Sequence, residues 1–271
     1  MELLEYLYKN INKSKNTIKN LLKNGNIYVN DKVITKYNYL LKETDKVEIR
    51  NKINNIDIIY EDKDIIVVDK PYNLLTISTN NEKEKTLYHM VSDYVKKNNK
   101  NSKIFVVHRL DKDTSGLVVF AKSEVIKNKL QDNWDKVNRE YIAIVEGKTK
   151  DKGIIKTYLE EKNNRIFSSN KGKLAITEYK KIKSNDKYTM LNINIKTGRK
   201  HQIRVHLKEM GNSIIGDKKY GCNGNPIKRM ALHAYKLEFK LNNKEYKFKI
   251  DIPNNFKKIC WQKYIQSIYF Y

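Results

Sequence analysis

The stretch that most constrains this chain runs from 106 to 123, where charged residues lie between two apolar runs. Val106-Val107 and the run 117–121 are rich in β-branched and aromatic residues, as is typical of buried strands. The residues between them end in Thr114-Ser115-Gly116, which favours a turn. Five side chains there are charged or titratable: His108, Arg109, Asp111, Lys112 and Asp113. Taken alone, such a loop is a solvated hairpin tip or a site of chemistry.

Composition narrows the class of partner. The 271 residues are enough for one large domain, or for a large and a small one, and 39% of them are hydrophobic. With 55 basic and 31 acidic residues the net charge is +24, which favours nucleic acid as partner over a membrane surface. We find no apolar run of about 18 residues, and no secretory or lipidation signal. We therefore expect a soluble, cytoplasmic, monomeric protein without a membrane partner.

The residues that usually hold cofactors are scarce. Cys222 and Cys260 predict neither a disulfide framework nor a zinc site, and the five histidines lack metal-ligand spacing. No Walker loop or Gly-x-Gly-x-x-Gly motif occurs. Any chemistry is therefore expected to use side chains alone, with no metal and no cofactor. Only seven of the 55 basic residues are arginines, which favours a need for the planar fork of arginine at the four that lie in the stretches discussed below: Arg109, Arg139, Arg199 and Arg204.

Residues 1–50 are predicted to form a small α/β module. Leu3 and Leu7 mark one short helix, and a second begins after Ser14 and ends at Gly25. Short strands follow around residues 27–29, 33–34 and 47–49. Four lysines lie off the apolar stripe of the second helix, where they form either a solvated face or an RNA contact: Lys13, Lys15, Lys19 and Lys23. The polar residues 51–56 are expected to be a linker, and 57–271 a second domain.

In that second domain the patterns predict strands at 58–60, 65–68 and 139–147, and helices at 86–97 and 124–137. From Gln202 to Leu207, apolar residues alternate with polar ones, which predicts a strand with a basic outer face. Tyr141, in the strand 139–147, is by spacing alone one more β-forming aromatic residue.

Several motifs together resemble one family. His-Arg-Leu-Asp-x-x-Thr-Ser-Gly at 108–116 resembles the signature of the RluA family of RNA pseudouridine synthases. Asp69-Lys70-Pro71, Arg139-x-Tyr-x-Ala and the motif Thr-Gly-Arg-x-His-Gln-x-Arg-x-His at 197–206 resemble it too. The sequence departs from the family at three positions, Asn73, Ile77 and Lys200. Residues 1–50 resemble the alpha-L RNA-binding domain, which implies phosphate contacts that position RNA.

The resemblance implies an α+β fold, with a mixed, mainly antiparallel sheet and flanking helices, and isomerisation of uridine to pseudouridine in RNA without a cofactor. Asp111 would be the catalytic carboxylate, as nucleophile or as base, with Asp113 as its rival. We expect Arg204 to be its cationic partner and Leu232 to form an apolar wall against the uracil. Tyr141 would stack on the uracil and help to remove the proton from C5. Arg109 is expected to contact phosphate or to fill the gap left by the base, and Arg199 and His201 to contact the RNA backbone or to order a loop. His108 would contact RNA or pack.

Two alternatives to this reading stay open. One is a non-catalytic RNA-binding or ribosome-assembly protein on the same fold, against which the retention of Asp111, Tyr141 and Arg204 counts. The other is a synthase acting on transfer RNA, although the amino-terminal module favours large-subunit ribosomal RNA.

Overall fold

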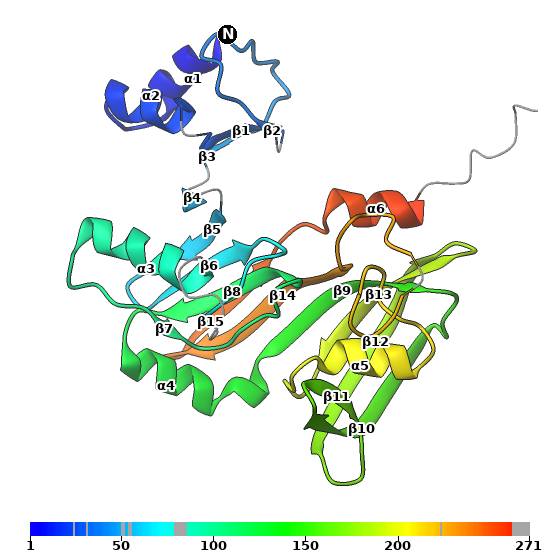
Figure 1. Ribbon diagram of the computed structural model, residues 1–271. Coiled ribbons are helices and arrows are strands. Elements are labelled where there is room, and N and C mark those ends of the chain that lie inside the picture. Colours follow the sequence, from blue (N-terminus) through cyan, green and yellow to red (C-terminus); the bar gives the residue numbers. More distant parts are fainter. Residues whose placement is uncertain are drawn as a thin grey trace, which may run out of the picture. The chain divides into compact units, whose positions relative to one another are not determined.

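The computed structural model describes residues 1–23, 25–30, 32–49, 52–53, 56–78, 86–222 and 224–261 (Figure 1). The chain divides into two compact units, Met1–Tyr60 and Glu61–Tyr271. In the described part, no helix is both long and apolar enough to cross a membrane.

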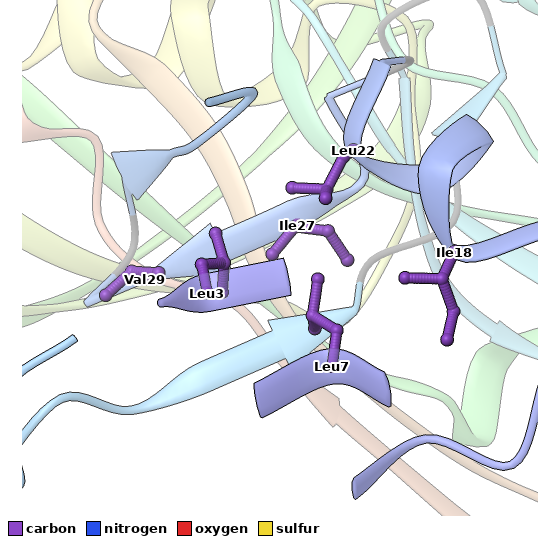
Figure 2. Packing of buried hydrophobic residues seen from close by; sticks show 6 residues of the cluster. All are labelled: Leu3, Leu7, Ile18, Leu22, Ile27 and Val29. Carbon is purple, nitrogen blue, oxygen red and sulfur yellow. The ribbon is translucent and has the colours of Figure 1, made fainter. Parts of the chain in front are cut away.

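The first unit contains the predicted helices and strands. Its helices are α1 (Leu3–Asn10) and α2 (Lys15–Lys23), and its three-stranded sheet has the order β2 (Lys32–Val33), β1 (Ile27–Val29), β3 (Val47–Ile49). Apolar side chains of both helices and of β1 form the core shown in Figure 2: Leu3, Leu7, Ile18, Leu22, Ile27 and Val29. The Ser14 hydroxyl accepts the N–H of Thr17 at 3.3 Å at the start of α2, as an N-cap residue does.

The stretch predicted as a linker contains strand pairing in its described residues. β4 (Lys52–Ile53) pairs antiparallel with the start of β5 (Ile56–Glu61), the strand along which the chain passes from one unit to the other. Packing divides the chain after Tyr60. The domain limits 1–50, 51–56 and 57–271 stay a prediction.

A mixed sheet forms the centre of the second unit, and this confirms the predicted α+β fold. Its order is β11 (Arg165–Ser168), β10 (Lys152–Lys162), β12 (Lys173–Ser184), β13 (Tyr188–Ile195), β9 (Asn138–Glu146), β14 (Leu232–Leu241), β8 (Ser115–Ala121), β6 (Ile65–Lys70). β7 (Phe105–Val106) pairs with β8, and β15 (Lys244–Lys249) with β14. Within this unit only β14 and β8 are parallel among the described strand pairs.

Gly116 is required where β8 meets β14. All seven residues of β8 are buried. Gly116 has a φ of +118°, and a Cβ at this position would lie 2.2 Å from the carbonyl oxygen of Ala234. The glycine of the signature therefore serves the parallel pairing of these two strands, beside the loop that carries Asp111.

The helices of this unit are α3 (Leu87–Asn98), α4 (Glu124–Asp132), the 3-10 turn η1 (Trp134–Lys136), α5 (Gln202–Glu209) and α6 (Asn254–Trp261). Thr86 and Ser123 cap α3 and α4, each accepting a backbone N–H of the first turn. α4 packs on β7 and β8, α6 on β13, and α5 on β11 and β12, as Figure 1 shows for α5.

The strand predicted over Gln202–Leu207 is wrong, because these residues form the first part of α5. All six are buried, the polar ones as deeply as the apolar ones. A short helix that is buried on every side has no exposed polar face, so its sequence lacks the helical period and its chance alternation imitates a strand.

Candidate active site

The loop between β7 and β8 holds Asp111 in a fixed place. The Thr76 hydroxyl donates to the carbonyl oxygen of Leu110 at 2.9 Å and accepts the N–H of Leu110 at 3.1 Å. The Thr114 N–H donates to the carbonyl oxygen of Asp111 at 3.1 Å. The backbone on both sides of Asp111 is thus restrained, while 27% of its side chain stays exposed.

A buried lysine joins this loop to the one after β6. The ammonium group of Lys70 donates to the carbonyl oxygens of Pro71 at 3.0 Å, Leu74 at 2.7 Å and Lys112 at 3.1 Å. Burial lowers the pKa of Lys70 to about 7, against the opposite effect of the Asp111 and Asp113 charges. Lys70 therefore connects the loop after β6 to the loop that carries Asp111.

Arg204, on α5, connects two carboxylates. Its Nη1 donates to Asp111 Oδ2 at 3.1 Å, and its Nε and Nη2 donate to the two oxygens of Asp217 at 2.7 and 2.8 Å. Burial opposes the charge of Arg204, but the hydrogen bonds and charges of Asp217 and Asp111 raise its pKa. Burial likewise opposes the charge of Asp217, but Arg204 lowers its pKa. Both side chains are therefore ionised at neutral pH, and Arg204 presents one N–H to Asp111.

His201 lies near the same oxygen of Asp111. Its Nε2 is 3.7 Å from Asp111 Oδ2, and its Nδ1 is 2.8 Å from the hydroxyl oxygen of Tyr220. Its backbone is left-handed, with a φ of +53°. Burial lowers the pKa of His201 to about 4, although the Asp111 charge raises it. The imidazole is therefore neutral at physiological pH.

Asp111 and Arg204 line a pocket of about 400 Å³. Tyr141, Ile195 and Leu232 give it apolar walls. Burial raises the pKa of Tyr141 to about 12, so its hydroxyl is not ionised at neutral pH. A carboxylate in a pocket with apolar and aromatic walls is suited to a planar base whose sugar reaches the carboxylate.

A second hollow, of about 330 Å³, shares Asp111, His201 and Arg204 with the pocket. Its rim carries the cations Arg109, Lys112, Lys218 and Lys219. Asp113 lines only this second hollow, which favours Asp111 as the carboxylate facing the pocket. The cationic rim is suited to the phosphates on either side of a nucleotide in the pocket.

The structure brings together every residue that the sequence assigned to the active site. The pocket is lined by Asp111, Tyr141, Arg204, Arg109, Leu232, Arg199 and His201. Arg109 and Arg199 are exposed, and Arg199 Nε donates to the carbonyl oxygen of Leu174 at 3.0 Å. Lys13, Lys15, Lys19 and Lys23 are exposed on or beside α2 in the first unit, and their RNA-binding role stays a prediction.

His108 packs in the structure, which favours the second of its two expected roles. Its Nε2 accepts the N–H of Val119 at 3.1 Å, and its ring stacks on Trp134 with centroids 4.6 Å apart. Burial lowers the pKa of His108 to about 3, so it carries no charge with which to bind phosphate at neutral pH.

The three departures from the family pattern are accommodated locally. Asn73 has a φ of +61°, a conformation that asparagine tolerates better than most residues that are not glycine. Lys200 forms an ion pair with Glu161. Ile77 lines the second hollow.

Sequence reasoning missed Thr76, Lys70 and Tyr220 as supports of the site, and gave Asp217 no role. Asp217 lies 13 residues after Arg204, and no spacing rule links the two side chains. The residues after the motif at 197–206, Ile214-Ile215-Gly216-Asp217 and Tyr220-Gly221, also resemble the family pattern, and this is the one signal that could have drawn attention to Asp217 and Tyr220.

Comparison with known proteins agrees with this geometry. Residues 64–209 match the RNA pseudouridylate synthase family, and residues 2–47 match the S4 domain family. The chain is 33% identical to ribosomal large subunit pseudouridine synthase D of Borreliella burgdorferi, over 85% of this chain and 74% of that one. It is 37% identical to ribosomal large subunit pseudouridine synthase C of Rickettsia bellii, over 79% and 74%.

The solved structure of human RNA pseudouridylate synthase domain containing 4 has the same fold, with a TM-score of 0.63 and 22% identity over 73% of this chain and 89% of that one. Fold and matched domains together define an RNA-modifying enzyme with a separate RNA-binding module. The chain belongs to the RluA-type family of RNA pseudouridine synthases, with an S4 domain at its amino-terminal end.

Proposed function

We propose that the enzyme isomerises uridine in large-subunit ribosomal RNA, with Asp111 as its catalytic carboxylate and with no cofactor. The observation that carries this proposal is the position of Asp111, which lies in the pocket with one oxygen bonded to Arg204. The choice of RNA is supported by the two relatives named for the large ribosomal subunit.

The reaction is an internal rearrangement. The bond between ribose C1′ and uracil N1 breaks, a bond from C1′ to C5 forms, C5 loses a proton and N1 gains one. Atoms and electrons balance without a redox partner. In the described residues, no cluster of His, Cys, Asp or Glu is placed to hold a metal ion.

Asp111 acts on the ribose, as a nucleophile at C1′ or as a base toward C2′. Both routes need an ionised carboxylate. A charge-assisted hydrogen bond from a cation fixes the orientation of such a carboxylate. Arg204 is that cation, and because Asp217 holds it from behind, its Nη1 stays directed at Asp111.

Tyr141 and Leu232 enclose the uracil while it turns from N1 to C5. Retaining the detached base is essential, because the new bond must form before the base can leave. Burial raises the pKa of Tyr141 to about 12, so the residue serves as an aromatic wall with a neutral hydroxyl rather than as a phenolate base.

A uridine within folded RNA must leave its stack, which costs a few kcal/mol. Arg109 is exposed, two residues before Asp111, and lines both hollows. It is placed to contact phosphate or to fill the gap left by the base. In the S4 domain, helix α2 buries Ile18 and Leu22. The four lysines on or beside α2 are exposed, which supports phosphate contacts by this part of the domain.

The proposal is tested by mapping pseudouridines in ribosomal and transfer RNA, using carbodiimide labelling and primer extension. Wild-type cells are compared with cells that lack the gene and with cells that carry Asp111→Asn. We expect the same few large-subunit sites to disappear in both altered strains. Loss of transfer RNA sites instead would identify transfer RNA as the substrate. An unchanged set of pseudouridines in both strains would favour a non-catalytic RNA-binding protein.

A further inference from the structure

The two oxygens of the Asp111 carboxylate have different surroundings. Oδ2 accepts from Arg204 Nη1 at 3.1 Å and has His201 Nε2 at 3.7 Å. Among the described residues, none forms a hydrogen bond or ion pair with Oδ1. The contacts of the described residues with this carboxylate are therefore all at Oδ2, and Oδ1 is the oxygen available to a ligand in the pocket.

Tyr220 decides which nitrogen of His201 carries the proton. The hydroxyl oxygen of Tyr220 accepts the N–H of Ile166 at 3.1 Å and lies 2.8 Å from His201 Nδ1. A phenol has one proton to donate, and the Ile166 N–H can only donate. Donation of the Tyr220 proton to Nδ1 is the arrangement that gives this proton an acceptor among the described residues. In this tautomer the proton of the neutral ring is on Nε2, the nitrogen that faces Asp111.

The surrounding structure holds both rings in place. The guanidinium carbon of Arg204 lies over the Tyr220 ring, 5.0 Å from the ring centroid. The rings of Tyr220 and His201 meet edge-to-face, with their centroids 5.5 Å apart. His201 also has a left-handed backbone, which is costly for this residue type and is found where a site requires it. Such support suits a side chain whose direction matters.

We propose that His201 is a positioning residue, whose Nε2–H is a second donor to Asp111 Oδ2 and whose orientation is set by Tyr220. This inference rests on the proposed role of Asp111. With Arg204 and His201 both on Oδ2, the carboxylate cannot turn, and Oδ1 is the oxygen presented to the ribose. The gap of 3.7 Å closes when substrate enters, as hydrogen bonds of empty active sites commonly tighten on binding.

Burial keeps His201 neutral, because it lowers the pKa of the imidazole to about 4, and the nearby cations act in the same direction. Arg204, Lys219 and Lys200 oppose its protonation, and Asp111 favours it. A neutral imidazole donates its N–H without adding a second full positive charge, so the carboxylate keeps its reactivity. His201 is thereby distinguished from an RNA-binding residue, which would need a charge or a contact with phosphate.

The test uses the full chain with an in vitro transcript of large-subunit ribosomal RNA. His201→Asn is the informative variant, because asparagine tolerates the left-handed backbone while its side chain is too short to reach Asp111. We expect the single-turnover rate at saturating RNA to fall about 10- to 100-fold, the effect of losing a hydrogen bond to a charged group. The RNA Kd should stay within about twofold, because the lost contact is with Asp111.

Tyr220→Phe removes the hydroxyl that sets the tautomer, and should slow the reaction about fivefold, as for a neutral hydrogen bond. The double variant should be no slower than His201→Asn, because Tyr220 acts through His201. His201→Gln restores an N–H of longer reach and should recover part of the rate. Tyr246→Phe is the matched control. The Tyr246 hydroxyl donates to Asp62 at a distance of 2.9 Å, and neither residue lines the pocket that contains Asp111.

Three results would overturn the inference. One is an unchanged rate in His201→Asn. Another is a weaker RNA Kd with an unchanged rate at saturation, which would make His201 an RNA contact. The third is additivity of the two single variants. Inactivity of the wild-type protein toward ribosomal and transfer RNA would instead count against the proposed function.

Discussion

Replacing Asp217 by asparagine tests how much the buried ion pair between Arg204 and Asp217 contributes to stability. The Asp217 side chain is 1% exposed and that of Arg204 is 7% exposed, so the pair is screened little by solvent. Removing one partner of a buried ion pair typically costs 3–5 kcal/mol. Asparagine keeps one acceptor and Asp111 remains, so we expect the lower end, about 3 kcal/mol of unfolding free energy. For a unit of this size that lowers Tm by about 6–12 °C.

The free energy of unfolding that Asp217→Asn loses should become smaller as the pH falls. Arg204 holds the pKa of Asp217 below its ordinary value of 3.8. A depressed carboxyl pKa stabilises the folded state above the unfolded pKa, and the contribution is lost as pH falls through the folded pKa. The difference in stability between wild type and Asp217→Asn should therefore be constant from about pH 7 to 5 and should shrink below about pH 4.

Thermal and urea unfolding of the full chain over this pH range measures both effects. Asp186→Asn is the matched control, because its side chain is 88% exposed and its ion pair with Lys148 is worth little. A Tm for Asp217→Asn equal to that of the control at pH 7, or a difference that stays the same as pH falls, would refute the reasoning.

Three further predictions concern other parts of the chain. Replacing all four lysines at 13, 15, 19 and 23 by alanine should weaken RNA binding and reduce the slope of log Kd against log salt by about 3; an unchanged slope in filter binding would contradict phosphate contacts. Gly116→Ala should cost about 3 kcal/mol or more in thermal unfolding, since its Cβ would meet Ala234, whereas Gly211→Ala, with a φ of +86° and open space, should cost only about 1 kcal/mol; equal losses would exclude the clash. Because burial raises the pKa of Tyr141 to about 12, the single-turnover rate should not rise with phenolate formation between about pH 7 and 9, and Tyr141→Phe should keep more activity than Tyr141→Ala; a steep rise with pH would restore a phenolate base.

The parts of the fold that sequence predicted well depend on local signals. The signature loop is bounded by apolar strands and a glycine, and the structure places Asp111 there between β7 and β8. Ser14 and Thr86 mark helix starts, and hydrogen bonds to both hydroxyls are present. The S4 helices are amphipathic, so their core positions follow from spacing.

The parts that sequence could not predict depend on tertiary contacts. The polar residues of α5 are buried because partners from distant segments satisfy them, as Thr177 does for His206 and Asp217 for Arg204. Lys70 is fully buried because three carbonyl oxygens surround its ammonium group. Lys112, Thr177 and Asp217 lie far along the sequence from the residues they contact, so a periodicity rule places such polar residues on a surface.

The central claim is that Asp111 carries out the isomerisation, and release of tritium from RNA labelled at uracil C5 tests it most directly. C5 loses its hydrogen only when the new bond to the ribose forms. We predict that the wild-type protein releases tritium from large-subunit ribosomal RNA, and that Asp111→Asn releases none while its RNA Kd stays within a few-fold. Release by Asp111→Asn at a rate near that of wild type would contradict the account.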